Sequence, residues 1–147
     1  MCGICGIIGE TKEKAYVLER MMKKMEHRGP DGGDTYIGDR AMLGFRRLSI
    51  IDLDAGMQPM YNEDGSMVLV FNGEIYNYQA LRQMLTQKGH QFQNDSDSEV
   101  LIHGYEEYQK DLLDKLRGMF GFAIWDEKKQ RLFAARDYFG IKPFYYT

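Results

Sequence analysis

The sequence predicts an α+β fold whose strands pair antiparallel. Three segments carry apolar residues at the spacing of an amphipathic helix, and several others are short apolar runs of strand length. Turns of only a few residues join neighbouring strand-like runs, which suits hairpins rather than the long crossovers that parallel strands need. Because no repeat or Gly/Ser-rich linker divides the 147 residues, we expect a single domain, 1–147.

The first part of the chain predicts a strand, a helix and a hairpin. A short buried strand is expected over Cys2–Ile8 and a helix over about Lys12–Met25, where apolar side chains recur at helical spacing. The proline and three glycines within His27–Gly33 cannot continue that helix. Thr35–Ile37 and Ala41–Phe45 flank a short polar turn and predict a hairpin.

The second part predicts two helices between strands. Met67–Phe71 is an apolar strand, and Asn77–Lys88 has helical spacing. A third helix is expected to start at Ser96, because Ser96–Glu99 reads SDSE, the pattern of a capping box. Met119–Trp125 and Arg131–Arg136 predict a final hairpin across a charged turn.

Composition excludes several classes of function. The 19 basic and 22 acidic residues give a formal charge of −3, so no nucleic-acid partner is expected. No apolar run approaches the roughly 18 residues of a membrane span, and the first residues lack the basic region of a signal peptide. Two cysteines provide no disulfide framework, which predicts a reducing, cytoplasmic location. The final apolar run, Phe144–Tyr146, predicts a domain cut from a longer protein.

Cys2 is the sharpest chemical feature. Removal of the initiator methionine would leave a thiol and a free α-amine on one residue. An α-amine with a pKa of about 7.7–8.0 can act as a base near neutral pH, and the thiolate is a nucleophile. The alternative interpretation is a small buried residue in a strand.

Cys2 and Cys5 also have the C-x-x-C spacing of redox and zinc motifs, but they occupy a strand-like run. The further ligands that a zinc site needs would have to come from His27, His90 and His103. These histidines are widely scattered in the sequence and are expected in loops or on the surface. We therefore predict no metal site.

Three further positions have both a functional and a structural interpretation. Asn72 and Gly73 could donate an amide and a backbone N–H to an oxyanion, or could form an ordinary turn. Arg46 or Arg47 could bind a carboxylate through two parallel hydrogen bonds, or could be a solvated strand end. Asp97 lies at a predicted helix start, where the helix dipole alone would stabilise a carboxylate.

Seven motifs in fixed order connect these positions: MCGI at 1–4, HRGPD at 27–31, RLSIID at 47–52, NGEIYN at 72–77, SDSE at 96–99, GMFGFA at 118–123 and RDYFGIKP at 136–143. Together they resemble the class II, N-terminal-nucleophile glutamine amidotransferases over essentially the whole chain. The wording of HRGPD, RLSIID and NGEIYN is most similar to the glutaminase domain of glutamine-hydrolysing asparagine synthetases.

The resemblance implies a four-layer αββα sandwich of two antiparallel sheets, the N-terminal nucleophile hydrolase fold. It also implies hydrolysis of L-glutamine to L-glutamate and ammonia through a cysteinyl thioester, with the ammonia used to make asparagine from aspartate. No metal or organic cofactor is implied for this domain. ATP and Mg²⁺ are expected only for a C-terminal synthetase domain of the parent protein. Formation of a homodimer is left as an open possibility.

The resemblance also implies a role for each site residue. Cys2 would be the nucleophile, its α-amine the base, and Asn72 with the Gly73 N–H the oxyanion hole. Arg47 would bind the substrate α-carboxylate, and Glu74 and Asp97 would bind its α-ammonium. Backbone atoms would line the pocket beside them, at Leu48, Ser49, Ile50 and Ile51.

Three alternatives remain at this stage. The chain could be a non-catalytic module that binds glutamine or only packs against a partner. It could be the glutaminase domain of a different ATP-dependent aminating enzyme. It could also be a C-x-x-C redox or metal protein, in which Cys5 would be essential.

Overall fold

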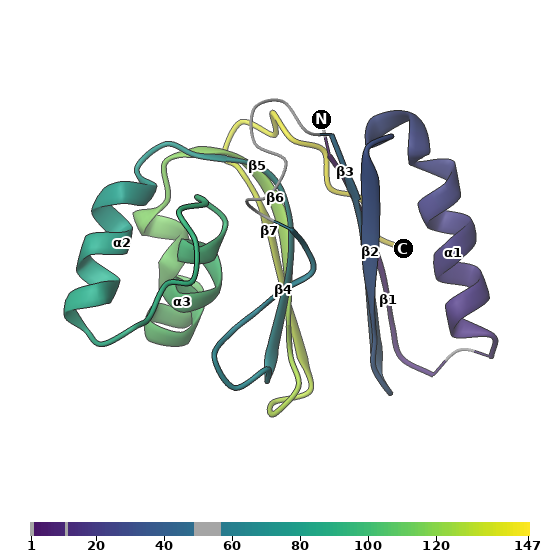
Figure 1. Cartoon of the computed structure of the whole chain (residues 1–147), viewed down its shortest axis with the longest axis horizontal. Helices are drawn as coiled ribbons and strands as arrows, with labels where there is room; N and C mark the ends of the chain where they lie inside the picture. The colour runs from purple at the N-terminus through teal and green to yellow at the C-terminus, as the bar shows by residue number, and fades with distance from the viewer. Residues whose placement is uncertain (1, 11, 49–56) are drawn as a thin grey trace.

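The computed structural model describes residues 2–10, 12–48 and 57–147. Two β-sheets lie face to face, and helices cover their outer faces (Figure 1). Helix α1 (Lys14–Lys24) covers one sheet, while α2 (Tyr78–Gln87) and α3 (Glu99–Tyr108) cover the other. All strand pairs are antiparallel, which confirms the predicted α+β class.

The first sheet contains β1 (Gly3–Ile8), β2 (Gly32–Ile37) and β3 (Ala41–Arg47), in the order β1-β3-β2. Its central strand, β3, therefore pairs with both neighbours. The predicted hairpin is confirmed, although β2 starts earlier than expected and β3 runs two residues further. A short 3₁₀ turn, Glu26–Arg28, connects α1 toward β2.

The second sheet has the order β4-β5-β6-β7. Its strands are β4 (Met60–Tyr61), β5 (Met67–Ile75), β6 (Gly118–Asp126) and β7 (Arg131–Arg136). The final hairpin is as predicted, whereas the two-residue β4 was not predicted. Strand β5 runs four residues beyond the predicted end, because β6 pairs with it as far as Ile75.

The start of α3 corrects the sequence prediction. The helix begins at Glu99, and the residue before it, Ser98, makes no capping hydrogen bond with its side chain. The Glu99 carboxylate accepts hydrogen bonds from the backbone N–H groups of Gln93 and Asn94, at 2.7 and 3.1 Å. The expected capping box is therefore absent here, and Glu99 instead braces the loop that leads into the helix.

Three apolar layers hold the elements together. The layer between the sheets contains Ala41, Leu43, Phe45, Val68, Val70, Ala123 and Trp125. A smaller layer joins the first sheet to α1, and the largest joins the second sheet to α2 and α3. Successive side chains of a strand point to opposite faces of the sheet. A residue that packs in one layer therefore shows that the residues two positions away face the same layer and that its immediate neighbours face the other side.

Asp137 fastens the segment after β7 to the second sheet. Its buried carboxylate accepts hydrogen bonds from the backbone N–H groups of Phe120, Ile141 and Lys142. A buried acceptor with three donors stabilises a loop that lacks regular structure. This contact gives the RDYFGIKP motif a structural role.

None of the described helices combines the length and apolarity needed to cross a bilayer.

Candidate active site

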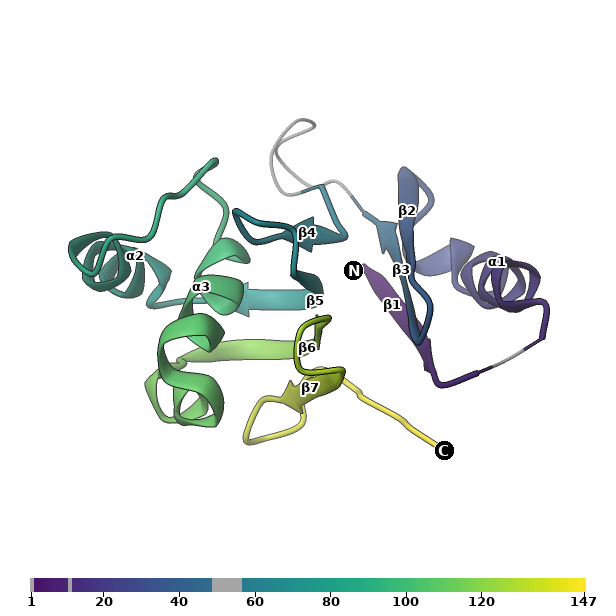
Figure 2. The ribbon, with the colours of Figure 1, turned by 90° about the horizontal axis from the view of Figure 1, so that it is seen from below.

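Three chain segments meet at one edge of the two sheets. The start of β1, the end of β3 and the end of β5 all lie at the upper edge in Figure 1. Gly3 pairs with Arg46, so the same register places Cys2 opposite Arg47. Strands β1 and β3 both contact β5, and Figure 2 shows the start of β1 beside the second sheet.

The two cysteines point to opposite faces of the first sheet. Cys2 packs with Ile4 against the layer between the sheets, whereas Cys5 packs against the layer under α1. Burial raises the pKa of the Cys5 thiol to about 11, with a smaller opposing effect from a backbone hydrogen bond at Gly44. Cys5 is therefore protonated and unreactive at neutral pH, and the two thiols are not oriented as a redox pair.

The two arginines at the end of β3 also separate by face. Arg47 shares a face with Phe45 of the inter-sheet layer, and its Nη1 lies 3.3 Å from Met57 Sδ. Arg46 points to the α1 face, where its Nη2 lies 3.3 Å from Glu26 Oε1. Of the two candidates, Arg47 is the one directed toward the layer between the sheets.

The HRGPD segment packs directly on this end of β3. The N–H of Asp31 donates to the carbonyl of Arg47 at 3.1 Å. A Cβ added to Gly29 would lie 2.5 Å from the carbonyl carbon of Arg46 and 2.6 Å from the nitrogen of Arg47. Only glycine permits such a close backbone approach, so this segment fixes the strand end that carries Arg47.

Asn72 and Gly73 are strand residues, and the interpretation of this dipeptide as a turn is wrong. They pair with Gly121 and Phe120 of β6. Asn72 is buried, and it shares a face with Val70 of the inter-sheet layer, so it points toward the first sheet.

Glu74 and Asp97 form a pair of neighbouring carboxylates. Asp97 Oδ2 accepts a hydrogen bond from the backbone N–H of Ile75 at 2.7 Å. Burial and the charge of Glu74 raise the pKa of Asp97, while the hydrogen bond from Ile75 opposes that increase. Two carboxylates whose charges repel each other make a local environment that favours a cation.

The predicted pocket-lining backbone is described only in part. Leu48 is half-buried and directly follows β3. Ser49, Ile50 and Ile51 lie outside the described residues. The described residues thus bring together Cys2, Arg47, Asn72, Gly73, Glu74 and Asp97 around the ends of three strands and the loop before α3.

Comparison with known families decides the classification. The model of the glutamine amidotransferase domain matches residues 1–147. The chain belongs to this family. The amidotransferase chain is 43% identical to a glutamine-hydrolyzing asparagine synthetase 3 of Bacillus subtilis over 153 residues, covering 100% of the chain and 25% of the relative. It is 44% identical to asparagine synthetase B of Escherichia coli, covering 99% of the chain and 26% of the relative. The chain thus spans about a quarter of these relatives.

Solved structures agree on the fold. The amidotransferase chain superimposes on an allosteric regulatory enzyme of purine biosynthesis with a TM-score of 0.74 at 23% identity, covering 93% of this chain and 37% of that one. For a glutamine phosphoribosylpyrophosphate amidotransferase from B. subtilis, the TM-score is 0.63 at 22% identity, with coverages of 92% and 36%. At such identities the likeness establishes the architecture alone.

One expectation about histidines is wrong. His103 is buried in α3, and its ring centroid lies 5.2 Å from that of His90. The 12 residues between the two histidines hide this proximity in the sequence. The spacing of His103 and Glu106, three apart on a helix, is the local signal that could have indicated a cluster.

We predict that Gly73→Ala damages the site. The added Cβ would collide with the carbonyl oxygen of Met119 and lie 2.7 Å from Phe120 Cα, both backbone atoms. Pairing of β5 with β6 would loosen beside Asn72, so the melting temperature and the glutaminase rate should both fall. The matched control is Gly121→Ala in the same ladder, where the nearest atom, Pro143 O, is 3.5 Å away. Equal melting temperatures for the two variants would contradict the prediction.

Proposed function

We propose that this chain hydrolyses L-glutamine to L-glutamate and ammonia, as the glutaminase domain of a glutamine-hydrolysing asparagine synthetase. The observation that carries the proposal is that Cys2, Arg47 and Asn72 all lie on the strand faces that border the layer between the sheets, where β1 starts and β3 and β5 end. The names of the relatives support the same reaction. We further propose that the arrangement is the αββα sandwich of N-terminal nucleophile hydrolases.

In the proposed reaction, the sulfur of Cys2 attacks the side-chain amide carbon of glutamine. The α-amine of Cys2, freed by removal of Met1, takes the thiol proton. The carbonyl oxygen becomes an oxyanion that accepts hydrogen bonds from the Asn72 amide and the Gly73 N–H. The amine returns the proton as ammonia leaves, which forms a γ-glutamyl thioester. Water then hydrolyses the thioester, releasing glutamate and restoring the thiol.

Recognition of the substrate rests on opposite charges at separate places. Glutamine carries an α-carboxylate and an α-ammonium, so its site needs a cation and one or two anions. Arg47 would bind the carboxylate with its planar guanidinium. The ammonium would lie by Glu74 and Asp97, where it would relieve the repulsion between the two carboxylates.

The proposed reaction needs no metal or organic cofactor in this domain. The ammonia would pass to a C-terminal synthetase domain of the parent protein, which would use ATP and Mg²⁺ to convert aspartate to asparagine. Large apolar side chains stand exposed near the C-terminal end and would suit contact with such a domain: Tyr138, Phe139, Ile141, Tyr145 and Tyr146.

The first test concerns the nucleophile. Cys2→Ala should abolish glutamine hydrolysis, and Cys5→Ser should retain it, because the Cys5 thiol faces α1 and has a raised pKa. Mass spectrometry of the active protein should show loss of Met1, and a glutamine-like electrophile should label Cys2. An active chain that retains Met1 would overturn the role of the α-amine. Glutamine binding without turnover or labelling would indicate the non-catalytic module.

A second prediction separates the two arginines. Arg47→Ala should raise the KM for glutamine about 10²-fold, because hydrogen bonds to charged groups contribute about 1.5–3 kcal/mol each. Arg47→Lys should also bind weakly, since an ammonium does not match the carboxylate with two parallel bonds. Arg46→Ala is the control: it removes the contact with Glu26 on the other face and should leave KM unchanged. A larger KM effect at Arg46 would reverse the assignment.

A third prediction concerns Asp97→Asn. Its folded-state pKa is raised above the usual value of about 3.9, so ionisation of Asp97 costs stability: the loss begins as the pH rises past the unfolded-state pKa and is complete above the folded-state pKa. The variant should therefore melt at the same or a higher temperature than the wild type at pH 7, with the difference shrinking below pH 4. Asparagine can still accept the hydrogen bond from Ile75.

The same variant should raise the KM for glutamine about 10-fold or more, because one charge facing the ammonium is lost. Asp95→Asn serves as the control, since the Asp95 side chain is fully exposed and pairs with Arg82 at the surface. An unchanged KM in Asp97→Asn would place the ammonium elsewhere, and a large loss of stability would show that Asp97 is a structural residue.

A further inference from the structure

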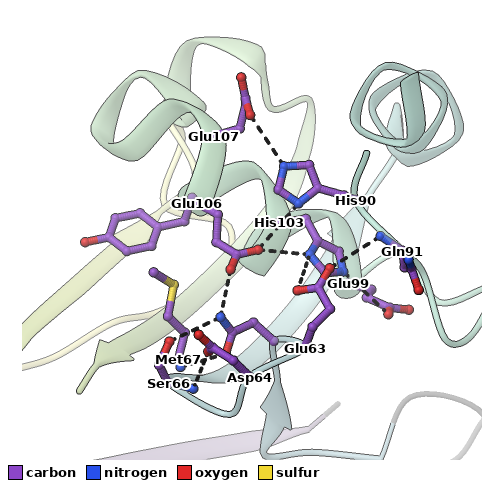
Figure 3. A network of polar contacts seen from close by, with 12 residues as sticks. Glu63, Asp64, Ser66, Met67, His90, Gln91, Glu99, His103, Glu106 and Glu107 are labelled. Atoms are coloured by element: carbon purple, nitrogen blue, oxygen red, sulfur yellow. Dashed lines mark hydrogen bonds and ion pairs between the residues drawn. The ribbon is translucent and has the colours of Figure 1, made fainter. Parts of the chain in front are cut away.

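A second polar cluster lies at the opposite end of β5 from the candidate active site (Figure 3). Glu63 comes from the turn between β4 and β5, and His90 from the loop after α2. His103 and Glu106 are three residues apart on one face of α3. That turn leads into Met67 at the start of β5, six residues from Gly73, which corresponds to about 20 Å along a strand.

We infer that Glu63, His90, His103 and Glu106 bind a divalent transition-metal ion, best matched by Zn²⁺. One donor atom from each residue lies within 4.8 Å of all the others. Glu106 Oε2 is 3.1 Å from His103 Nδ1 and 3.5 Å from His90 Nδ1, and Glu63 Oε2 is 3.7 Å from His103 Nδ1. Tetrahedral zinc with bonds of 2.0–2.1 Å separates its donors by about 3.3–3.4 Å. The three distances given above already lie close to this separation, and the remaining donor pairs would have to close from at most 4.8 Å.

Each histidine has a carboxylate beside its other ring nitrogen. His103 Nε2 lies 3.6 Å from Glu99 Oε1, and His90 Nε2 lies 3.5 Å from Glu107 Oε2. Metal binding at Nδ1 places the ring proton on Nε2, where these carboxylates can accept it. Such pairs orient the imidazole rings and raise their basicity in known metal sites.

Glu106 is oriented in the same way. Its Oε1 accepts a hydrogen bond of 2.7 Å from the side-chain amide of Asn62, which leaves Oε2 directed at the two histidines. Asn62 is itself held, because its Oδ1 accepts the backbone N–H of Met67 at 2.9 Å. The carboxylate that contacts both rings thus has a fixed position before any ion binds.

The number of carboxylates around the buried His103 imidazole is a second observation that favours a cation. The His103 side chain is only 2% exposed, and its ring nitrogens lie 3.1 Å from a carboxylate oxygen of Glu106, 3.6 Å from one of Glu99 and 3.7 Å from one of Glu63. This excess of carboxylates around a buried imidazole is an environment that a divalent ion would neutralise.

The donor set discriminates between metals. Two imidazole nitrogens and two carboxylate oxygens at tetrahedral spacing suit Zn²⁺. Calcium takes six to eight oxygen ligands and magnesium an octahedron of oxygens, so both match the cluster poorly. The four ligands leave no position designed for substrate, and the site would be structural: it would join the β4–β5 turn, the α2–α3 loop and α3.

The test measures zinc binding and stability in the 147-residue chain with both cysteines replaced by serine, so that thiols cannot bind the ion. After removal of metals by a chelator, calorimetry should find one Zn²⁺ per chain. The melting temperature should rise by about 5–10 °C at a free Zn²⁺ concentration of 100 times Kd. Co²⁺ should give the strong visible absorption of a tetrahedral complex. Mg²⁺ and Ca²⁺ should cause no shift.

Variants decide whether these residues form the site. His90→Ala and Glu63→Gln each remove one ligand at a partly exposed position, and should abolish the zinc-dependent shift in melting temperature while the chain stays folded. Asp64→Asn, a neighbour in the same turn with the same loss of charge, should retain the shift. In the cysteine-containing chain, His90→Ala should hydrolyse glutamine at the wild-type rate at 25 °C. Failure of the cysteine-free chain to bind Zn²⁺ would overturn the inference. So would a Zn²⁺ affinity in His90→Ala and Glu63→Gln equal to that of the cysteine-free chain without these substitutions.

Discussion

Phe45 and Trp125, with the aliphatic side chains around them, form the contact between the two sheets on which the candidate active site depends. Burying a side chain of this size contributes about 1.5–3 kcal/mol, and the strand faces that meet here cannot slip without losing it. Because side chains alternate, the residues that continue these faces are fixed as well. Arg47 is the next residue after Phe45 on the same face of β3, and Asn72 is the next after Val70 on the same face of β5. The packing that stabilises the domain therefore also directs the side chains of Arg47 and Asn72 toward the layer between the sheets.

One glycine on each strand, Gly73 on β5 and Gly118 on β6, lets the two backbones approach closely near the end of the sheet. A Cβ on Gly73 would strike the backbone of Met119, and a Cβ on Gly118 would strike the carbonyl of Glu74. The sequence prediction nevertheless ended β5 at Phe71, four residues before the strand ends at Ile75. Asn-Gly favours a turn locally, but the register with β6 overrides the local preference. Such a register is a tertiary property that one sequence does not reveal.

Sequence reasoning was strongest where residue chemistry alone is informative, and weakest where two segments must meet. Residue types and periodicity predicted the three helices, both hairpins and most of the strands, but not β4. The choice of Arg47 over Arg46 by face required knowledge of which side of β3 is buried against the second sheet. The proximity of His90 to His103 depends on the path of the α2–α3 loop, which the 12 residues between the two histidines do not indicate.

The two ends of β5 carry carboxylates in different surroundings. Glu74 is exposed and Asp97 half-buried, so a cation between them could exchange with solvent, as the proposed substrate ammonium would once per turnover. At the other end the central group, His103, is almost fully buried, and its partners are held by Asn62 and by the loop before α3. A cation enclosed in that way leaves slowly, and its binding energy adds to the stability of the folded chain rather than to a reaction. Because a permanent ion would fasten the start of β5 to α3, it would hold the second sheet in place, while the exchangeable site at the other end stays free to bind and release its ligand.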